Sequence, residues 1–265
     1  MLCSLSRCRV LVNERVLACS FTSNTPFTEI AQSRRSTKRF NPSLPISPSI
    51  LESILADTLR TPTSFNLQPY ACVLVKEDSA KSSLSTAMLG GNVFRVRDAP
   101  VTAVFLADLE PSKRIDKIMS IEKSYRAPEY NAMMPLAAGY FTGEGPWLGN
   151  AIKNAAAAAM SPVKPMPTVS KVNAWSGKNT AMAAMSFIHS STSFGLATCA
   201  MEGYDVLRVR EALRIPDRYE IPLMVSVGYS MDEEFEEEIK RTNRLELGEV
   251  FFDDTFGNPT SQSRA

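Results

Sequence analysis

Ser33-Arg34-Arg35-Ser36-Thr37-Lys38-Arg39-Phe40 (SRRSTKRF) is the first of two runs that decide how this chain folds. It places four cations among hydroxyl side chains, which is the chemistry that binds a phosphate group. The second run, Pro62-Thr63-Ser64-Phe65-Asn66-Leu67-Gln68-Pro69-Tyr70, is a polar loop between prolines that enters the apolar run 71–75. A helix is predicted between the two runs. The order is therefore a phosphate cluster, a helix, and a loop able to touch a planar polar ring.

The composition is that of an ordinary globular protein. The chain has 265 residues, of which 44% are hydrophobic and 22% are charged, with a formal net charge of +1. This length suits one core with an added lid. The near-neutral charge gives no reason to expect nucleic acid as a partner. No stretch approaches the roughly 18 apolar residues that a membrane span requires, so no transmembrane segment is predicted.

Cysteine and histidine usage argues against disulfides and metal. The five cysteines are scattered without a CxxC pair, and His189 is the one histidine. A disulfide framework and a zinc site are therefore not expected. We predict no metal ligand of any kind.

Residues 1–25 differ in composition from the rest. They carry Arg7, Arg9 and Arg15 against one acid, Glu14, with serines among apolar residues. An arginine-rich, serine-containing and acid-poor start is typical of a mitochondrial transit peptide. The sequence therefore predicts a mitochondrial location. The alternative is a poorly ordered tail on a cytoplasmic protein.

Helices and strands are expected to alternate along the chain, which gives an α/β or α+β class. Ser47 is predicted as the N-cap of a helix that has Pro48 at its first position. A first helix is expected to run into the 34–39 cluster, and 90–95 is expected to be a turn. Apolar patterning predicts strands at 70–75, 101–106, 196–201 and 221–229, and helices at 49–59, 79–88, 114–125, 149–160, 171–195 and 206–213. The block 110–172 is interpreted as an inserted cap.

The chain resembles the FMN-dependent nitroreductase family, of the bacterial oxygen-insensitive NAD(P)H type. The matching motifs occur in the family's order: SRRSTKRF, PTSFNLQPY, GGNVFRVRDAP, FGLATCAMEGYD, VSVGY and RTNRLELGEV. The resemblance implies an α+β fold with a central mixed β-sheet surrounded by helices, in an intertwined homodimer with FMN sites at its interface. It assigns 26–258 to one FMN-binding domain, with 110–172 as a variable cap and 259–265 as a tail.

The resemblance also implies which residues hold the FMN phosphate. By position in the motifs, Arg34, Arg35 and Ser36 begin this site and Arg244 completes it from the C-terminal side. The family often has a further cation where this chain has Thr242. Arg241 is adjacent and is the candidate substitute for it.

For the flavin ring, the resemblance assigns Lys38 and Arg95 to the edge where negative charge develops on reduction, with Asn92 beside them. The family commonly has lysine where this chain has Arg95. The turn Glu202-Gly203 supplies backbone N–H groups, and glycine suits a close backbone approach.

The loop residues Pro62, Thr63, Ser64 and Asn66 match the segment that reaches the flavin across the dimer interface. Phe65 matches a substrate-facing position, where an aromatic ring would stack on a flat acceptor.

The implied function is an FMN-dependent NAD(P)H oxidoreductase that reduces nitroaromatics or quinones by ping-pong hydride transfer through flavin N5. NADH or NADPH is the donor, and no side chain is assigned as catalytic, because binding and orientation supply the catalysis. A flavin dehalogenase or a specialised dehydrogenase on the same fold is an alternative enzyme. A flavin-binding protein without enzymatic activity is the alternative of a different class.

Overall fold

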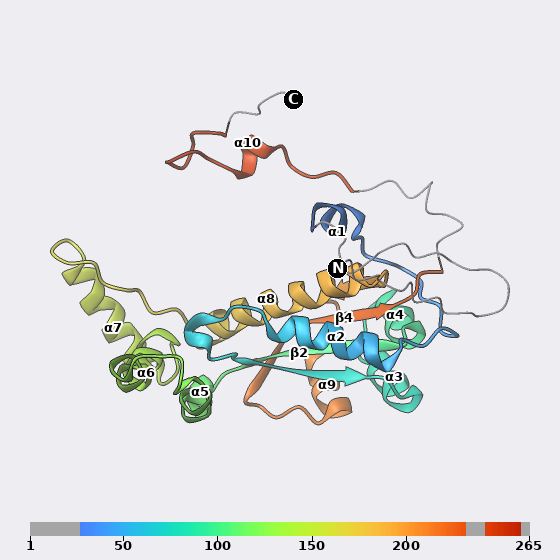
Figure 1. The fold of residues 1–265 in the computed structure, drawn as a ribbon, viewed down its shortest axis with the longest axis horizontal. Helices are drawn as coiled ribbons and strands as arrows, with labels where there is room; N and C mark the ends of the chain where they lie inside the picture. Colours follow the sequence, from blue (N-terminus) through green and yellow to red (C-terminus); the bar gives the residue numbers. More distant parts are fainter. Residues whose placement is uncertain (1–26, 232–241, 261–265) are drawn as a thin grey trace, which may run out of the picture. The chain divides into compact units, whose positions relative to one another are not determined.

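The computed structural model describes residues 27–231 and 242–260 of the chain. These residues fall into two units, one that ends at Met231 and one that follows it, and each is described by itself. The first unit is a four-stranded sheet with helices packed on both faces (Figure 1). The predicted α+β class is confirmed.

The sheet contains β1 (Tyr70–Val75), β2 (Val101–Asp108), β3 (Ala197–Met201) and β4 (Tyr219–Gly228) in the order β1-β2-β4-β3. All three strand pairings are antiparallel. An isolated parallel bridge from Ser36 to Thr198 adds one parallel contact to this antiparallel sheet, which makes it mixed. β2 is buried along its whole length, as expected for a central strand between two helical layers.

One face of the sheet is covered by α2 (Pro48–Leu59) and the long helix α8 (Val172–Ser193). Phe105 of β2 and Phe187 of α8 meet with ring centroids 5.7 Å apart. Ser47 caps α2, because its side chain accepts a hydrogen bond from the Ile50 N–H, as predicted. The short helix α1 (Phe27–Ser33) packs against α8.

The opposite face is covered by α3 (Asp78–Ser85), α4 (Asn92–Asp98) and α9 (Val206–Leu213). The prediction that 90–95 forms a turn is wrong beyond Gly91. The chain becomes helical at Asn92, because this helix carries Val96 into the core, where it is fully buried. The glycine pair only shapes the entry, with Gly90 at φ 54°.

Beyond the end of β2, the chain forms the cap. It consists of the 3₁₀ turn η2 (Pro111–Arg114) and three helices, α5 (Ile115–Glu122), α6 (Pro128–Phe141) and α7 (Trp147–Met160). The sequence predicted α5 and α7 but not α6, which contains Pro135 in its interior. A separate apolar cluster joins the cap to the start of α8 through Leu67, Ile115, Ile118, Met134, Ala138 and Trp175.

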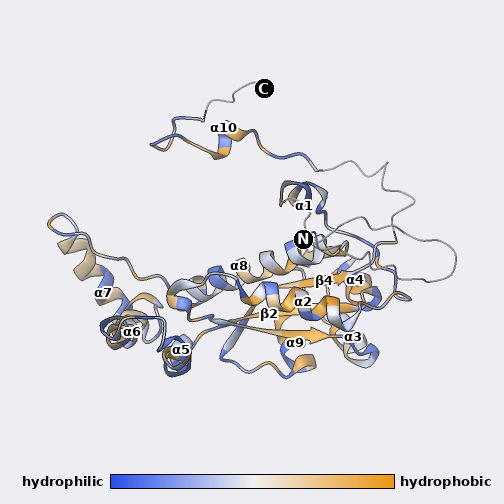
Figure 2. Cartoon of the chain, viewed as in Figure 1, coloured by the Kyte–Doolittle hydropathy of each residue, from blue (hydrophilic) through white to orange (hydrophobic). Residues whose placement is uncertain are grey.

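Helix α7 turns its polar side chains inward. The Asn150 side chain donates to the Gly143 carbonyl at 2.7 Å, and Asn154 exchanges two hydrogen bonds with the Val169 backbone. Leu148 and Ile152 are 56% and 62% exposed. The outward side of α7 is therefore apolar, and Figure 2 shows this helix mostly in pale orange, with blue where its polar residues lie.

The second unit, as far as it is described, has one short helix, α10 (Leu247–Val250), which begins with a capping box between Glu246 and Glu249. The rings of Phe252 and Phe256 lie 4.7 Å apart. Neither unit contains, within its described residues, a helix long and apolar enough to cross a membrane. The segment predicted as a transit peptide, 1–25, lies outside the described residues.

Candidate functional site

The cationic run is extended. The expectation that the first helix runs into it is wrong, because α1 ends at Ser33 and the next residues pair with strand β3 instead. The Thr37 N–H donates to the Thr198 carbonyl at 2.9 Å. Extended backbone alternates its side chains, so Thr37 is buried while Ser36 and Lys38 are exposed.

Two cations of this run have no ion-pair partner among the described residues. Neither Arg34 nor Lys38 forms an ion pair with any of the described residues. Arg34 lies near the C-terminal part of α8. Burial lowers the pKa of His189 there, and the positive charge of Arg34 lowers it further. Arg35 is half-buried beside them.

At the other end of β3, three predicted residues come together. The Asn92 carboxamide donates to the Gly203 carbonyl at 3.1 Å, and Arg95 donates to the Asn92 side-chain oxygen. A Cβ at Gly203 would lie 2.9 Å from Asn92 Nδ2, so a larger residue here would displace the end of the Asn92 side chain. Glu202, the residue before it, is exposed.

Strand β3 connects the two groups. Burial raises the pKa of the Cys199 thiol, and nearby Arg95 acts in the opposite direction, which places Arg95 beside the strand. At about 3.3 Å per residue, Thr198 and Gly203 are at most about 17 Å apart. We call this set the β3 site; it comprises Arg34, Arg35, Ser36, Thr37, Lys38, Asn92, Arg95, Glu202 and Gly203.

The predicted loop is a strained turn. Its centre is the 3₁₀ turn η1 (Ser64–Asn66), in which Phe65 and Asn66 have φ values of 56° and 53°. Left-handed backbone at residues other than glycine costs about 1–3 kcal/mol each and persists only when the surroundings hold it. The Ser64 N–H donates to Asn179 Oδ1 of α8 at 2.9 Å, and the Gln68 N–H donates to Thr63 Oγ1 at 3.0 Å.

A buried carboxylate anchors the end of this loop. Asp108, at the end of β2, accepts two hydrogen bonds from Arg218 at 2.7 Å and one from Arg114 at 3.0 Å. Arg114 also donates to the Gln68 carbonyl at 2.7 Å. Burial by itself raises the pKa of Asp108, but these hydrogen bonds outweigh it and hold the pKa below its ordinary value. We call this group the Asp108 clamp.

The loop and the β3 site lie at opposite ends of α8. The loop contacts Asn179 in the first half of the helix, and Arg34 lies near His189 in its last part. These two positions are about 15 Å apart at about 1.5 Å per residue. Figure 1 shows α4 and α1 near one end of α8 and the cap near the other. Within this chain, the predicted site residues therefore form two separate groups.

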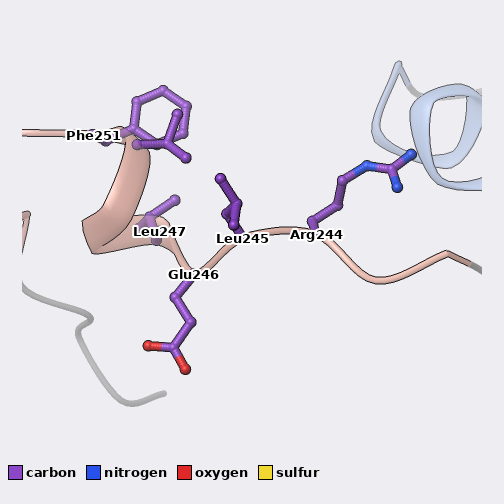
Figure 3. Close-up of a pocket in the computed structure, with 6 residues that line it drawn as sticks. Arg244, Leu245, Glu246, Leu247 and Phe251 are labelled. Atoms are coloured by element: carbon purple, nitrogen blue, oxygen red, sulfur yellow. The ribbon is translucent and has the colours of Figure 1, made fainter.

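Arg244 belongs to the second unit, which is described by itself. Its guanidinium donates to Thr242 and Asn243 of its own segment. It borders an open hollow of about 420 Å³, in which Leu245, Leu247 and Phe251 gather while Arg244 and Glu246 extend away (Figure 3). Arg241 lies outside the described residues.

Comparisons with known proteins agree with this architecture. The model of the nitroreductase family matches residues 31–229. The chain belongs to the nitroreductase family. It is an oxidoreductase, in keeping with that family.

Among individual relatives, a protein of Thermus thermophilus named NADH dehydrogenase is 28% identical over 204 residues, which are 77% of this chain and 86% of the relative. The nitroreductase ydfN of Bacillus subtilis superposes with a TM-score of 0.68 at 21% identity, covering 85% of this chain and 97% of that one. A nitroreductase from Exiguobacterium sibiricum, solved in complex with FMN, superposes with a TM-score of 0.61 at 20% identity and covers 87% and 98%. These structures share the fold.

The β3 site has the unsatisfied groups that a bound flavin nucleotide requires. Thr37 Oγ1 and Arg95 Nε are buried and have no hydrogen-bond partner among the described residues. Orphaned buried polar atoms are uncommon and call for an explanation. With the unpaired cations of Arg34 and Lys38 beside them, an anionic ligand with polar ring edges fits. No cluster of three or more metal-binding side chains occurs in the described ranges.

Sequence reasoning missed the residues that hold the loop: Asp108, Arg114, Glu122, Asn179 and Arg218. Only one of them had a local signal. Asp108 ends an apolar strand, where a carboxylate is unusual and indicates a buried pairing.

Proposed function

We propose that this chain is an FMN-dependent NAD(P)H oxidoreductase that reduces flat, electron-poor acceptors such as nitroaromatics and quinones. The observation that carries the proposal is the β3 site, where unpaired cations, orphaned polar atoms and a glycine close to Asn92 lie along one strand and the turn after it. When bound, FMN supplies the hydride chemistry, with NADH or NADPH as donor. The FMN-bound structural neighbour supports the choice of cofactor.

Each part of the site has a distinct task in this proposal. Arg34, Arg35 and Ser36, with Arg244, hold the phosphate through charge-assisted hydrogen bonds, and Arg241 supplements them. Lys38 and Arg95 place positive charge at the ring edge where negative charge develops, and Asn92 bonds to that edge. Positive charges that are fixed in the fold stabilise the negative charge of the reduced flavin, and they do so without first having to reorient. The Glu202-Gly203 turn presents backbone N–H groups.

Acceptor binding is assigned to the loop. Phe65 packs against Phe141 of the cap with ring centroids 5.5 Å apart. The exposed side of this aromatic pair is suited to a flat acceptor, which stacks on aromatic faces. Pro62, Thr63, Ser64 and Asn66 complete the wall. No side chain acts as nucleophile or base; the residues bind, orient and exclude water.

The site is assigned to a homodimer in this proposal, as the resemblance to the family implies. The loop lies about 15 Å along α8 from the His189 end of the β3 site, so a loop from a partner is the simplest way to complete the site. The outward face of α8 supports such a homodimer, because Met182 and Met185, each 39% exposed, lie on it one turn apart. The exposed Leu245 and Phe251 of the C-terminal unit are also suited to cover a partner.

The first test is the visible spectrum of the purified protein before and after anaerobic NADH or NADPH. The proposal predicts a bound flavin that bleaches, and reoxidation of the reduced protein by a quinone or a nitroaromatic compound. Flavin that stays oxidised with both donors would support a binding protein. No flavin after incubation with FMN would refute the proposal.

The shared site is tested by complementation between two variants. Arg34→Ala/Arg95→Ala disables the β3 site, and Ser64→Ala/Asn66→Ala truncates the loop. Each site combines the β3 site of one copy with the loop of the other. In a dimer of one copy of each variant, one site therefore has both defects and the other has neither, so refolding the two variants together should restore flavin reduction. If the mixture is no more active than its components, while sedimentation shows mixed dimers, the loop does not serve the partner's site.

A mitochondrial location is proposed from residues 1–25, because of their arginine-rich, acid-poor composition. Replacing Arg7, Arg9 and Arg15 with glutamine should abolish import into isolated mitochondria. Import that persists in this variant, or its absence from the full chain, would favour the cytoplasmic alternative.

A further inference from the structure

One contact joins the cap directly to the left-handed turn of the loop. Glu122 is the last residue of α5 and is 9% exposed. Its Oε1 accepts a hydrogen bond of 2.6 Å from Asn66 Nδ2, across 56 residues of sequence. A carboxylate is a stronger acceptor than a neutral oxygen, and a short bond of this kind is the strong type.

The charge of Glu122 is balanced from within the cap. Arg126 donates to Glu122 Oε1 at 3.2 Å, and its Nε lies 2.6 Å from Glu122 Oε2 as an ion pair. The Arg126 guanidinium lies over the Tyr130 ring of α6, 4.4 Å from its centroid. The carboxylate is therefore held from within the cap by Arg126, which lies between α5 and α6, and its charge is compensated at low exposure.

The Asn66 side chain has little freedom left. While Nδ2 donates to Glu122, Oδ1 accepts from Gln68 Nε2 at 3.3 Å. Both ends of the carboxamide are engaged, which fixes its orientation. Asn66 is also in the left-handed region at φ 53°, which asparagine tolerates but does not prefer. Removing Glu122 leaves a strained residue without its strongest side-chain bond.

We propose that Glu122 is a positioning residue: it holds Asn66, and through it the turn 64–68, so that cap and loop form one mechanical unit. The consequence for flavin binding rests on the function proposed above, whereas the effect on the loop does not. Coupling between two sites is reciprocal. A ligand that stabilises the loop therefore also stabilises α5, and a change that loosens α5 lowers the affinity for that ligand.

The test uses Glu122→Ala with Glu129→Ala as its control, since Glu129 is an exposed carboxylate in the first turn of α6. Amide hydrogen exchange at 64–68 should be about tenfold faster in Glu122→Ala and unchanged in the control, as expected for one charge-assisted bond. The FMN Kd, measured by flavin fluorescence, should rise by a similar factor of about ten. Equal exchange in Glu122→Ala and the wild type overturns the proposal.

A second pair of variants separates positioning from simple loss of stability. Asn66→Asp places two carboxylates together and should loosen the loop more than Glu122→Ala does. Adding Glu122→Gln to it reverses the polarity of the bond, because the new carboxamide donates to the new carboxylate. Exchange at 64–68 and the FMN Kd should then return most of the way to wild type. A folded double variant that shows no recovery also overturns the proposal.

The outcomes distinguish this proposal from the one on which it rests. Exchange at 64–68 is measured without flavin, so it reports on Glu122 even if the protein binds no FMN. If wild type binds FMN and Glu122→Ala loses neither affinity nor protection, only the positioning role is refuted. If exchange responds as expected but no variant binds FMN, only the proposed cofactor is refuted.

Discussion

Near the first half of α8, carboxylates are matched by arginines, whereas near its C-terminal end two cations have no ion-pair partner among the described residues. The loop is held by Asn179, Arg114 and Glu122, and Asp108 accepts from two arginines. Buried atoms without a hydrogen-bond partner in the described ranges occur in both regions: Tyr70 Oη and Glu122 Oε2 near the loop, and Thr37 Oγ1 and Arg95 Nε at the β3 site. The regions therefore differ in charge: Arg34 and Lys38 of the second form no ion pairs with described residues and are suited to an anionic ligand.

This contrast suggests that one region contributes mainly to the free energy of folding and the other mainly to the free energy of ligand binding. Paired groups contribute to folding stability, and unpaired cations contribute to ligand affinity. Variants at the β3 site should therefore change binding and leave stability nearly unchanged, while variants of the Asp108 clamp should do the reverse. The following predictions test that separation from the largest expected effect to the smallest.

Arg34→Ala combined with Arg244→Ala should give a colourless protein. Each arginine supplies charge-assisted hydrogen bonds of about 1.5–3 kcal/mol, so FMN affinity should fall about 10²–10⁴-fold. The measurement is the flavin content of the purified protein and the FMN Kd. Arg97→Ala, at an exposed arginine on the far part of α4, is the control. A double variant that purifies yellow with stoichiometric FMN would show that the phosphate binds elsewhere.

Asp108→Asn should lower the free energy of unfolding by much more than it lowers the free energy of flavin binding. It removes the charge between two arginines, and breaking a buried pair in this way costs about 3–5 kcal/mol. Urea denaturation measures the free energy of unfolding. Glu110→Gln is the matched control, because Glu110 forms a 3.6 Å ion pair with Arg218 at 40% exposure and should cost at most about 1 kcal/mol.

The same clamp predicts an acid dependence. The pKa of Asp108 in the folded chain is below its value of about 3.9 in the unfolded chain. Its stabilisation is therefore complete above about pH 4 and is lost as the pH falls through the lower folded pKa. The difference in unfolding free energy between wild type and Asp108→Asn should shrink in that acid range. A difference that stays constant down to pH 2 would mean that another group is responsible.

Gly203→Ala should weaken flavin binding by less than about tenfold, because the atom that the new Cβ meets is the movable end of a side chain. The added Cβ lies 2.9 Å from Asn92 Nδ2 and forces that side chain away from the backbone. Gly149→Ala is the control, because nothing lies within 4 Å of its Cβ and it sits inside helix α7. That control should be slightly stabilising, by about 0.5–1 kcal/mol. Equal flavin affinity in both variants would remove Gly203 from the site.

Most elements were predictable from the sequence, because their signals are local. An N-cap with proline predicted α2, and apolar runs predicted the strands. Helix α6 was missed because Pro135 reads as a helix breaker, and α4 was missed in part because Gly90-Gly91 indicates a turn. In both cases tertiary burial, of Met134 and of Val96, decides the structure.

Site residues were predictable where they belong to a motif, and were not predictable where they depend on a partner far away in the sequence. The structure brings Asn92, Arg95 and Gly203 together, as their positions in the motifs implied, although their role in binding stays a prediction. Glu122 and Asn179 were not predictable, because their partners lie 56 and 115 residues away. No local pattern records such a pairing; only the packed fold creates it.

The exposed apolar side of helix α7 affects how a newly synthesised chain assembles. With its asparagines bonded inward and Leu148 and Ile152 turned outward, it presents an exposed apolar surface. If a second copy covers that surface in the homodimer proposed above, the covering step is bimolecular and its rate depends on concentration, whereas the folding of the sheet does not. A newly made chain at low concentration would then expose an aggregation-prone surface until it meets a partner.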